Sequence, residues 1–217
     1  MGTLVALEPP HERLRAKLHE VAGVDVSGRA AKDAFKAEIA YYLEHHLEGR
    51  DADSLDRLRD ECAAVLQRSL GDVAAAIDPG VVKRAMLDAI HFDAYADAAP
   101  ALRALRDGGL RLVVASNWDC SLPDALAATG LGPRLDGTIT SAQAGAAKPD
   151  PSIFRAALAA AGVPASAAVH VGDSPREDVE GARAAGIEPI LVLRGRGAAP
   201  PDVRTIRSLD ELVELAA

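Results

Sequence analysis

Charged and hydroxyl side chains follow several short apolar runs in the second half of the 217-residue sequence. Ser116 and Asn117 come after one run, and the pair Gly172-Asp173 comes after another, with Asp178 shortly beyond. Lys148 stands before a proline and a stretch of helical pattern. Two carboxylates suit Mg²⁺, which pairs with phosphate oxygens, while a lysine and hydroxyl or N–H donors suit an anion. Together these residue types indicate phosphoryl-transfer chemistry, which depends on positioning and charge neutralisation.

Each feature alone also fits an ordinary structural role. A Ser-Asn pair after a strand is common turn chemistry, Lys-Pro is a usual helix entry, and Gly-Asp is a common cap. His170, inside an apolar run, is interpreted as a core histidine with a satisfied hydrogen bond. His45 and His46 are neighbours on a predicted helix and point in different directions, which disfavours a metal role.

The elements that must position these residues are predicted from the apolar pattern. Short solid apolar runs are typical of strands covered on both faces, and their alternation with helices predicts a parallel sheet with right-handed crossovers. The runs are Leu110 to Ala115, Gly137 to Thr140, Ala167 to Val171 and Ile190 to Leu193, with helices expected at Ser152 to Ala161 and Arg176 to Ala185. We therefore expect an α/β fold with a Rossmann-like parallel sheet core, whose chemistry lies beyond the carboxyl ends of the strands.

The earlier part of the chain, from about residue 10 to 95, has apolar residues at helical spacing. One face comprises Leu55, Leu58, Cys62, Val65 and Leu66, and another comprises Phe35, Ile39, Tyr42, Leu43 and Leu47. No strand pattern of useful length appears there, so we expect an inserted antiparallel helical bundle. The expected domains are residues 1–9 with 96–217 for the α/β core, and 10–95 for the helical part.

Composition excludes several classes of protein. The formal net charge of −8 argues against broad nucleic-acid binding, and no apolar run approaches the ~20 residues that span a bilayer. The N-terminus lacks the basic region of a signal peptide, and two cysteines cannot build a disulfide framework. We expect a cytoplasmic protein with no nucleic-acid or membrane partner. There is no GxxxxGK[ST] or GxGxxG motif, and Gly195–Gly197 is expected to be a loop.

The order Ser116, Lys148, then Gly172-Asp173 to Asp178 resembles motifs two, three and four of the haloacid dehalogenase (HAD) superfamily. The surrounding words LVVASNWD, AAKPDPSIF and VHVGDSPREDVEGARAAGI are similar too, and the resemblance covers essentially the whole chain. The helical stretch at about 10 to 95 looks like the α-helical cap of subfamily I. The resemblance implies that this cap closes over the site and selects substrates.

The resemblance also implies roles for individual residues. Ser116 would hold a phosphoryl oxygen with Asn117 beside it, and Lys148 would neutralise charge on the nucleophile and the phosphoryl group. Asp173 and Asp178 would hold Mg²⁺, directly or through water. Thr3 would contribute to substrate binding, because Gly2-Thr3 match the end of the first motif.

The nucleophile that the resemblance implies is not in this chain. It is an aspartate that forms an aspartyl-phosphate, and it would lie two residues before Met1, at the end of a first, central strand. The run Leu4 to Leu7 is a possible substitute strand, although Glu8-Pro9-Pro10 ends it quickly. Loss of a nucleophile costs on the order of 10⁶ in rate. We therefore expect the literal chain to be poorly stable and nearly inactive, and the natural protein to begin about 8 to 15 residues earlier.

The favoured function is a Mg²⁺-dependent phosphomonoesterase acting on a small phosphorylated metabolite. One alternative is a catalytically inactive HAD-fold binding or regulatory protein, and another is a hydrolase that attacks carbon, of the haloacid dehalogenase type. The acidic motif from Asp173 to Asp178 argues against the dehalogenase, which needs no Mg²⁺. Tyr41, Tyr42 and His45 are candidates for substrate selection and equally for the core or the surface, and Trp118 is a candidate for the entrance to the site and equally for ordinary packing. The sequence does not indicate an oligomeric state.

Overall fold

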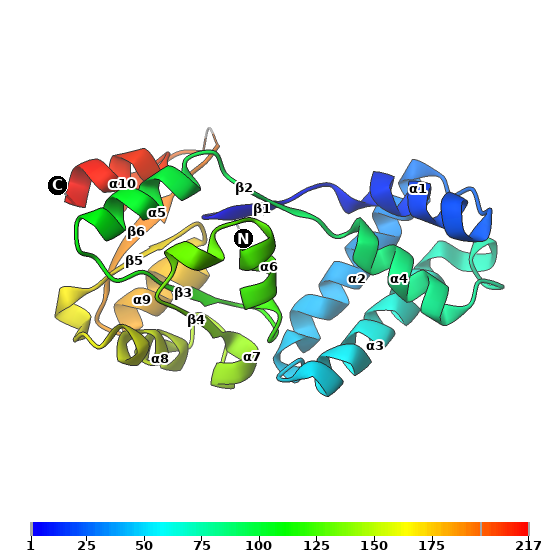
Figure 1. The fold of residues 1–217 in the computed structure, drawn as a ribbon, viewed down its shortest axis with the longest axis horizontal. Coiled ribbons are helices and arrows are strands. Elements are labelled where there is room, and N and C mark those ends of the chain that lie inside the picture. Colours follow the sequence, from blue (N-terminus) through cyan, green and yellow to red (C-terminus); the bar gives the residue numbers. More distant parts are fainter. Residues whose placement is uncertain (1, 196, 217) are drawn as a thin grey trace. The chain divides into compact units, whose positions relative to one another are not determined.

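The computed structural model describes residues 2–195 and 197–216, which form two compact units. One unit comprises Met1–Ala6 and Asp93–Ala217, and the other comprises Leu7–Phe92 (Figure 1). Both boundaries lie a few residues before those expected from the sequence. Met1, Arg196 within the expected Gly195–Gly197 loop, and Ala217 lie outside the described residues.

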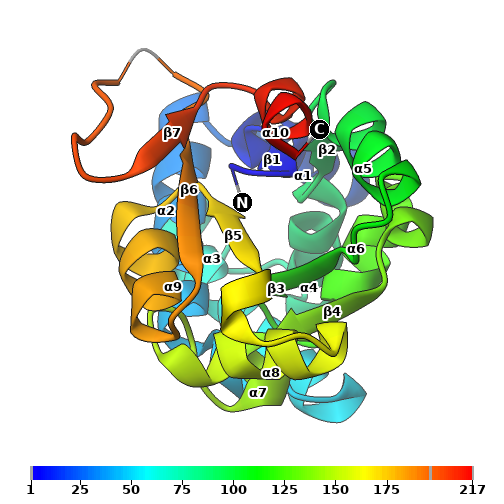
Figure 2. The ribbon, with the colours of Figure 1, turned by 90° about the vertical axis from the view of Figure 1, so that its left-hand side faces the viewer.

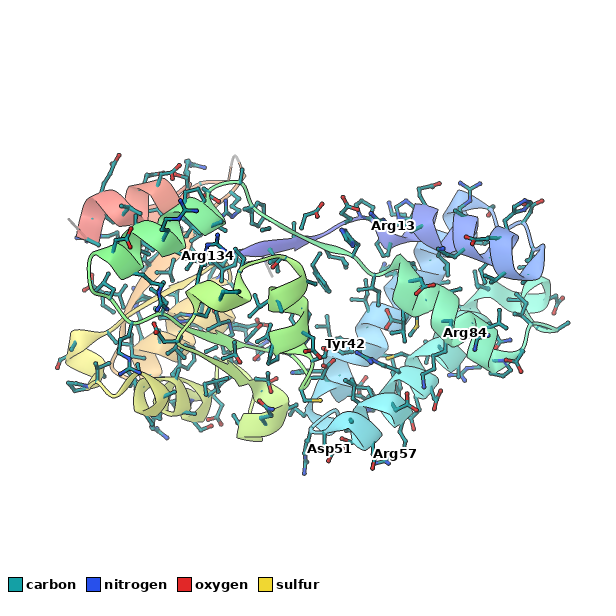
Figure 3. The ribbon with its side chains drawn as sticks, in the orientation of Figure 1. Arg13, Tyr42, Asp51, Arg57, Arg84 and Arg134 are labelled. Carbon is teal, nitrogen blue, oxygen red and sulfur yellow. The ribbon has the colours of Figure 1, made fainter. Side chains whose placement is uncertain are left out.

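The unit Leu7–Phe92 is helical, and its helices begin at residues suited to start them. Its elements are α1 (Pro10–Ala22), α2 (Gly28–His45), α3 (Ala52–Leu70) and α4 (Pro79–Ala89), with 3-10 turns at His46–Glu48 and Gly71–Val73. The Ser27 hydroxyl accepts from the Ala30 N–H. Asp51, labelled in Figure 3, lies at the start of α3, and its carboxylate accepts from the Ser54 N–H. Such caps satisfy N–H groups that have no partner inside the helix.

The core of this unit follows the predicted faces with one rotation. Leu55, Leu58, Cys62 and Leu66 of α3 are buried as expected. On α2 the buried face runs through Phe35 and Glu38, which is only 4% exposed, whereas Leu43 is 54% exposed. The predicted face continued from Phe35 at intervals of four residues, to Ile39 and Leu43. The structure instead buries Glu38, three residues after Phe35. Burial raises the pKa of Glu38 to about 7, against the opposing effect of its hydrogen bond with Cys62.

The other unit is built on parallel strands. They are β3 (Val113–Ser116), β4 (Gly137–Thr140), β5 (Val169–Gly172), β6 (Glu188–Val192) and β7 (Arg204–Ile206). The pairs β3–β4, β5–β6 and β6–β7 are all parallel, which confirms the Rossmann-like prediction. The first strand begins at Val113 rather than Leu110, which is 48% exposed and follows the turn at Gly108 and Gly109.

Helices connect and cover these strands. They are α5 (Ala98–Asp107), α6 (Leu122–Ala128), α7 (Ser141–Ala144), α8 (Pro151–Ala161), α9 (Gly181–Ala184) and α10 (Leu209–Ala216), with 3-10 turns at Gly132–Arg134 and Ala165–Ala167. The helix expected at Arg176 to Ala185 is instead a π-helix, η5 (Pro175–Glu180), that continues into α9. No helix within the described ranges is long and apolar enough to cross a membrane.

The parallel strands form two groups rather than one continuous sheet. Within the described residues β3 pairs only with β4, and β5 heads a separate group in the order β5-β6-β7. Figure 2 shows β3 and β5 as the inner strands, with β4 outside one and β6 and β7 outside the other. The sequence predicted one parallel sheet, whereas the described strands pair as these two groups.

Two further strands lie where the chain passes between the units. Val5–Leu7 forms β1 and pairs with β2 (Phe92–Ala94). The run from Leu4 therefore does become a strand, but it does not join β3 or β5. The strand Phe92–Ala94 also corrects the expectation of no strand before residue 95, because three residues are too few to show an alternating pattern.

Candidate functional site

Asn117 ties the loop after β3 to the loop that carries Lys148. Its Nδ2 donates to the Lys148 carbonyl oxygen at 3.1 Å, and the Lys148 N–H donates to Asn117 Oδ1 at 2.7 Å. Ser116 ends β3 directly before it. The predicted residues Ser116, Asn117 and Lys148 are thus brought together, with Asn117 serving to position the Lys148 backbone.

Asp178 is the most heavily bonded carboxylate of the site and is only 3% exposed. Its Oδ1 lies 2.6 Å from Lys148 Nζ and 2.9 Å from His170 Nε2, and its Oδ2 accepts from the Ser174 N–H at 2.9 Å. Burial alone raises the pKa of Asp178, but the His170 hydrogen bond and the Lys148 charge outweigh it and hold that pKa well below its usual range. The carboxylate is therefore ionised at neutral pH.

His170 has the satisfied role that the sequence predicted. Besides Asp178, it contacts Phe154 in an edge-on arrangement with ring centroids 4.9 Å apart. The histidine lies on β5, and its hydrogen bond to Asp178 Oδ1 fixes the orientation of the carboxylate.

Asp173 lies beside the first described residues of the chain. The Thr3 hydroxyl donates to Asp173 Oδ1 at 2.8 Å. Gly2 has a φ of +88°, and a Cβ at this position would lie 2.2 Å from Asp173 Oδ2. Asp178 has a similar neighbour, because a Cβ on Gly172 would lie 2.1 Å from Asp178 Cγ. Each predicted metal ligand is therefore backed by a glycine whose lack of a side chain makes room for it.

Arg194 holds the Gly2-Thr3 segment in place and was not predicted. Its Nε donates to the Gly2 carbonyl oxygen at 3.0 Å, its Nη1 donates to Asp97 Oδ2 at 3.0 Å, and its Nη2 donates to the Thr3 carbonyl oxygen. The guanidinium also lies 3.7 Å from the centroid of the Tyr95 ring. Arg194 follows β6 closely, so the rule that pointed to Ser116 and Asp173 would have found it as well.

A cavity of about 220 Å³ within the α/β unit is lined by the predicted site residues except Asn117. Its polar lining includes Thr3, Ser116, Lys148, Asp173 and Asp178. Trp118 also lines this cavity, and a place beside the site was one of the two roles predicted for that side chain. We call this space the central cavity. Lys148, the two carboxylates and the two hydroxyls make a donor set able to bind a phosphate group together with a divalent cation.

A model of the haloacid dehalogenase-like hydrolases matches residues 1–186. The chain belongs to this family. Haloacid dehalogenase-like hydrolase domain-containing protein 3 of Bos taurus is 45% identical over 95 residues, which cover 44% of this chain and 38% of that protein. The phosphoserine phosphatase of Thermus thermophilus is 35% identical over 122 residues, which cover 56% of this chain and 49% of the relative. The chain thus matches less than half the length of these curated relatives.

Solved structures of haloacid dehalogenase-like proteins share the fold. A HAD phosphatase from Thermococcus onnurineus has a TM-score of 0.64 at 23% identity, over 99% of this chain and 94% of that one. The L-2-haloacid dehalogenase of Xanthobacter autotrophicus has a TM-score of 0.68 at 20% identity, over 99% and 94%. At such identities the likeness shows the fold alone, and both phosphatases and dehalogenases have it.

Proposed function

We propose that this haloacid dehalogenase-like chain is the body of a Mg²⁺-dependent phosphomonoesterase that acts on a small phosphorylated metabolite. The observation that carries the proposal is the convergence of Thr3, Ser116, Lys148, Asp173 and Asp178 on the central cavity. Three curated relatives named as phosphatases support it, among them a glyceraldehyde 3-phosphate phosphatase of Methanopyrus kandleri that is 33% identical over 103 residues.

The two carboxylates fit a metal ion unequally. Asp178 already accepts hydrogen bonds from Lys148, His170 and the Ser174 N–H, so it fits contact with the metal ion through a water molecule. Asp173 is half-buried and accepts, from the side chains of the described residues, a hydrogen bond from Thr3, so it fits a direct ligand. Mg²⁺ keeps several waters and needs few carboxylates, so this set suits it. When bound, the ion would neutralise phosphate charge as a Lewis acid.

The remaining residues have roles suited to their chemistry. The Ser116 hydroxyl would donate to a phosphoryl oxygen, and Lys148 would offset negative charge on the phosphate and on an attacking carboxylate. Asn117 would hold Lys148 in position through its paired bonds to the Lys148 backbone. The helical unit Leu7–Phe92 would act as a cap that governs access and substrate choice.

The nucleophile in this proposal is an aspartate outside the present residues, two positions before Met1. Its carboxylate oxygen would form a bond to phosphorus while the phosphorus–oxygen bond to the alcohol breaks and the alcohol takes up a proton. Water would then cleave the aspartyl-phosphate to release inorganic phosphate and restore the carboxylate.

The test is p-nitrophenyl phosphate turnover by a chain extended at its N-terminus, with Asp or Asn two positions before Met1. We expect turnover with Asp only, abolished by EDTA and by Asp173→Ala. Halide release from a 2-haloacid that resists EDTA would instead identify a dehalogenase. Calorimetric binding of a phosphate ester by both forms, with turnover by neither, would identify a binding protein.

A further inference from the structure

The ladder between β3 and β4 ends at a residue of the candidate site. Its last register pair joins Ser116 to Thr140, and the chain beyond Thr140 turns into α7. Among the described residues, this ladder therefore gives no strand partner to the backbone of Trp118, two residues after Ser116. Buried backbone N–H and carbonyl groups have to be paired in some other way.

The Ser141 hydroxyl takes the place of a strand partner for Trp118. Its Oγ accepts from the Trp118 N–H at 2.9 Å and donates to the Trp118 carbonyl oxygen at 3.1 Å. The Ala142 N–H donates to the same carbonyl oxygen at 3.2 Å. Because a hydroxyl has one proton to donate and lone pairs to accept, one side chain binds both backbone polar groups of Trp118.

This contact is buried, which makes its loss costly. Ser141 is 0% exposed and Trp118 is 8% exposed. A buried N–H that loses its partner has given up its water and gains no other bond in return. Removal of the Ser141 hydroxyl should therefore release the Trp118 backbone from its present position.

The helix that Ser141 begins does not use this hydroxyl as its cap. The Thr140 side chain caps α7, and its Oγ accepts from the Gln143 N–H at 3.1 Å. Thr140 is 0% exposed, as Ser141 is. Of two consecutive buried hydroxyls, one thus serves α7 and the other serves the loop after β3. The pair provides a matched control for any test of Ser141.

The bond to Ser141 completes the fixing of three consecutive residues. Ser116 is held by the ladder, and the Asn117 side chain is bonded twice to the Lys148 backbone. Trp118 is held by Ser141. Both Ser116 and Trp118 line the central cavity. A hydroxyl stabilises an anion best when its direction is fixed before the anion arrives, so the hold on this loop bears directly on phosphate binding.

We propose that Ser141 is a positioning residue for phosphate binding, which holds Trp118 and thereby fixes the turn that directs the Ser116 hydroxyl into the central cavity. The inference rests on the proposed function, in which Ser116 donates to a phosphoryl oxygen. The described residues that line the cavity do not include Ser141. Its effect therefore passes through the loop after β3 and not through contact with the phosphate.

The experiment measures the Kd of the present chain for inorganic phosphate by calorimetry in the presence of Mg²⁺. Ser141→Ala should weaken phosphate binding about tenfold, which corresponds to the net contribution of one hydrogen bond. Should Ser141→Ala not fold, Ser141→Cys takes its place with the same direction of change, because a thiol is a weaker donor and acceptor. An unchanged Kd in the folded variant would overturn the inference.

Thr140→Val is the control for a general loss of order. It removes the neighbouring buried hydroxyl and the cap of α7 but leaves both bonds from Ser141 to Trp118 in place. Urea unfolding should show a loss of stability in both variants, whereas phosphate binding should weaken in Ser141→Ala alone. Equal weakening of phosphate binding in the two variants would overturn the inference.

A double variant shows whether Ser141 acts through Ser116. Ser116→Ala alone should also weaken phosphate binding about tenfold, and addition of Ser141→Ala should then weaken it no further. Additive losses would overturn the inference, because independent effects add. An unchanged Kd in Ser141→Ala leaves the proposed function standing. Absence of phosphate binding by every form, wild type included, would instead remove the phosphate site of the proposed function and the inference with it.

Discussion

The Lys148 ammonium and the Asp178 carboxylate form an ion pair with Nζ and Oδ1 2.6 Å apart, and their side chains are only 10% and 5% exposed. A pair this well covered behaves differently from one at the surface. Removal of one partner leaves the other charge in a poorly solvated place, and the cost exceeds what the pair itself contributes.

Lys148→Met should therefore lower the free energy of unfolding of the α/β unit by about 3–5 kcal/mol. Urea unfolding followed by Trp118 fluorescence measures it, since Trp118 lies in that unit. The matched control is Arg183→Met in the same unit: Arg183 Nη1 lies 2.9 Å from Asp202 Oδ2, but the two side chains are 43% and 66% exposed, so a much smaller loss is expected. Equal losses in the two variants would contradict the prediction.

Asn117→Ala should loosen Lys148 without touching its charge. It removes both side-chain bonds to the Lys148 backbone, at a cost of about 1–3 kcal/mol. The Lys148 amide should exchange faster in the variant, while the amides of β6 should change only through the global loss. Gln143→Ala, at an exposed position, is the control. An unchanged Lys148 amide would show that the loop is held by other contacts.

Arg194→Lys should free the Gly2-Thr3 segment although it keeps the positive charge. A lysine cannot reproduce a fork that reaches the Gly2 and Thr3 carbonyls and Asp97 together. We expect a loss of about 1–3 kcal/mol and faster exchange at the Leu209 N–H, which donates to Asp97 Oδ2 at 2.8 Å. Arg183→Lys, in an exposed pair with Asp202, should change neither quantity by much.

Glu38 should make the helical unit less stable as the pH rises. Burial raises its pKa from 4.5 to about 7, so the folded state binds the proton more tightly than the unfolded state does. Stability is therefore highest below about pH 4.5 and falls as the pH rises toward 7, by roughly 3 kcal/mol.

Glu38→Gln should remove this fall, because glutamine keeps the size and hydrogen-bonding capacity of the protonated acid. Urea unfolding followed by circular dichroism at pH 5 and pH 8 measures the difference, with Glu44→Gln at an exposed position as the control. A wild-type and a Glu38→Gln protein with the same pH dependence would show that Glu38 ionises freely in the folded state.

The sequence predicted strands well where each forms one short, uninterrupted run. Gly137–Thr140 is a strand with the predicted bounds, and the order of strands and helices led to the right fold class. Ser116, Lys148, Asp173 and Asp178 all reach the central cavity, because each follows a strand end or opens the next helix. Local pattern is enough for such residues, since the topology brings strand ends together.

Other features depended on contacts that no local pattern records. Glu38 is buried because it lies on the same face of α2 as the buried residues Ala34 and Phe35. Apolar periodicity does not identify this position, because the residue there is charged. The bond from Arg194 to the Gly2 carbonyl joins residues at opposite ends of the sequence. The π-helix at Pro175–Glu180 is capped by the Ser174 hydroxyl, which accepts from the Glu177 N–H, and apolar spacing alone does not distinguish it from an α-helix.

The glycines behind the two carboxylates change what it means for such a site to be lost. A single methyl group at Gly2 or Gly172 would occupy the place of Asp173 or Asp178, at the 2.2 Å and 2.1 Å approaches found there. A chain could therefore keep every ionisable residue of the site and still have no site. A comparison of related sequences that checks only the acidic and basic residues would wrongly score such a chain as having the site. The residues at the positions of Gly2 and Gly172 should therefore be checked first.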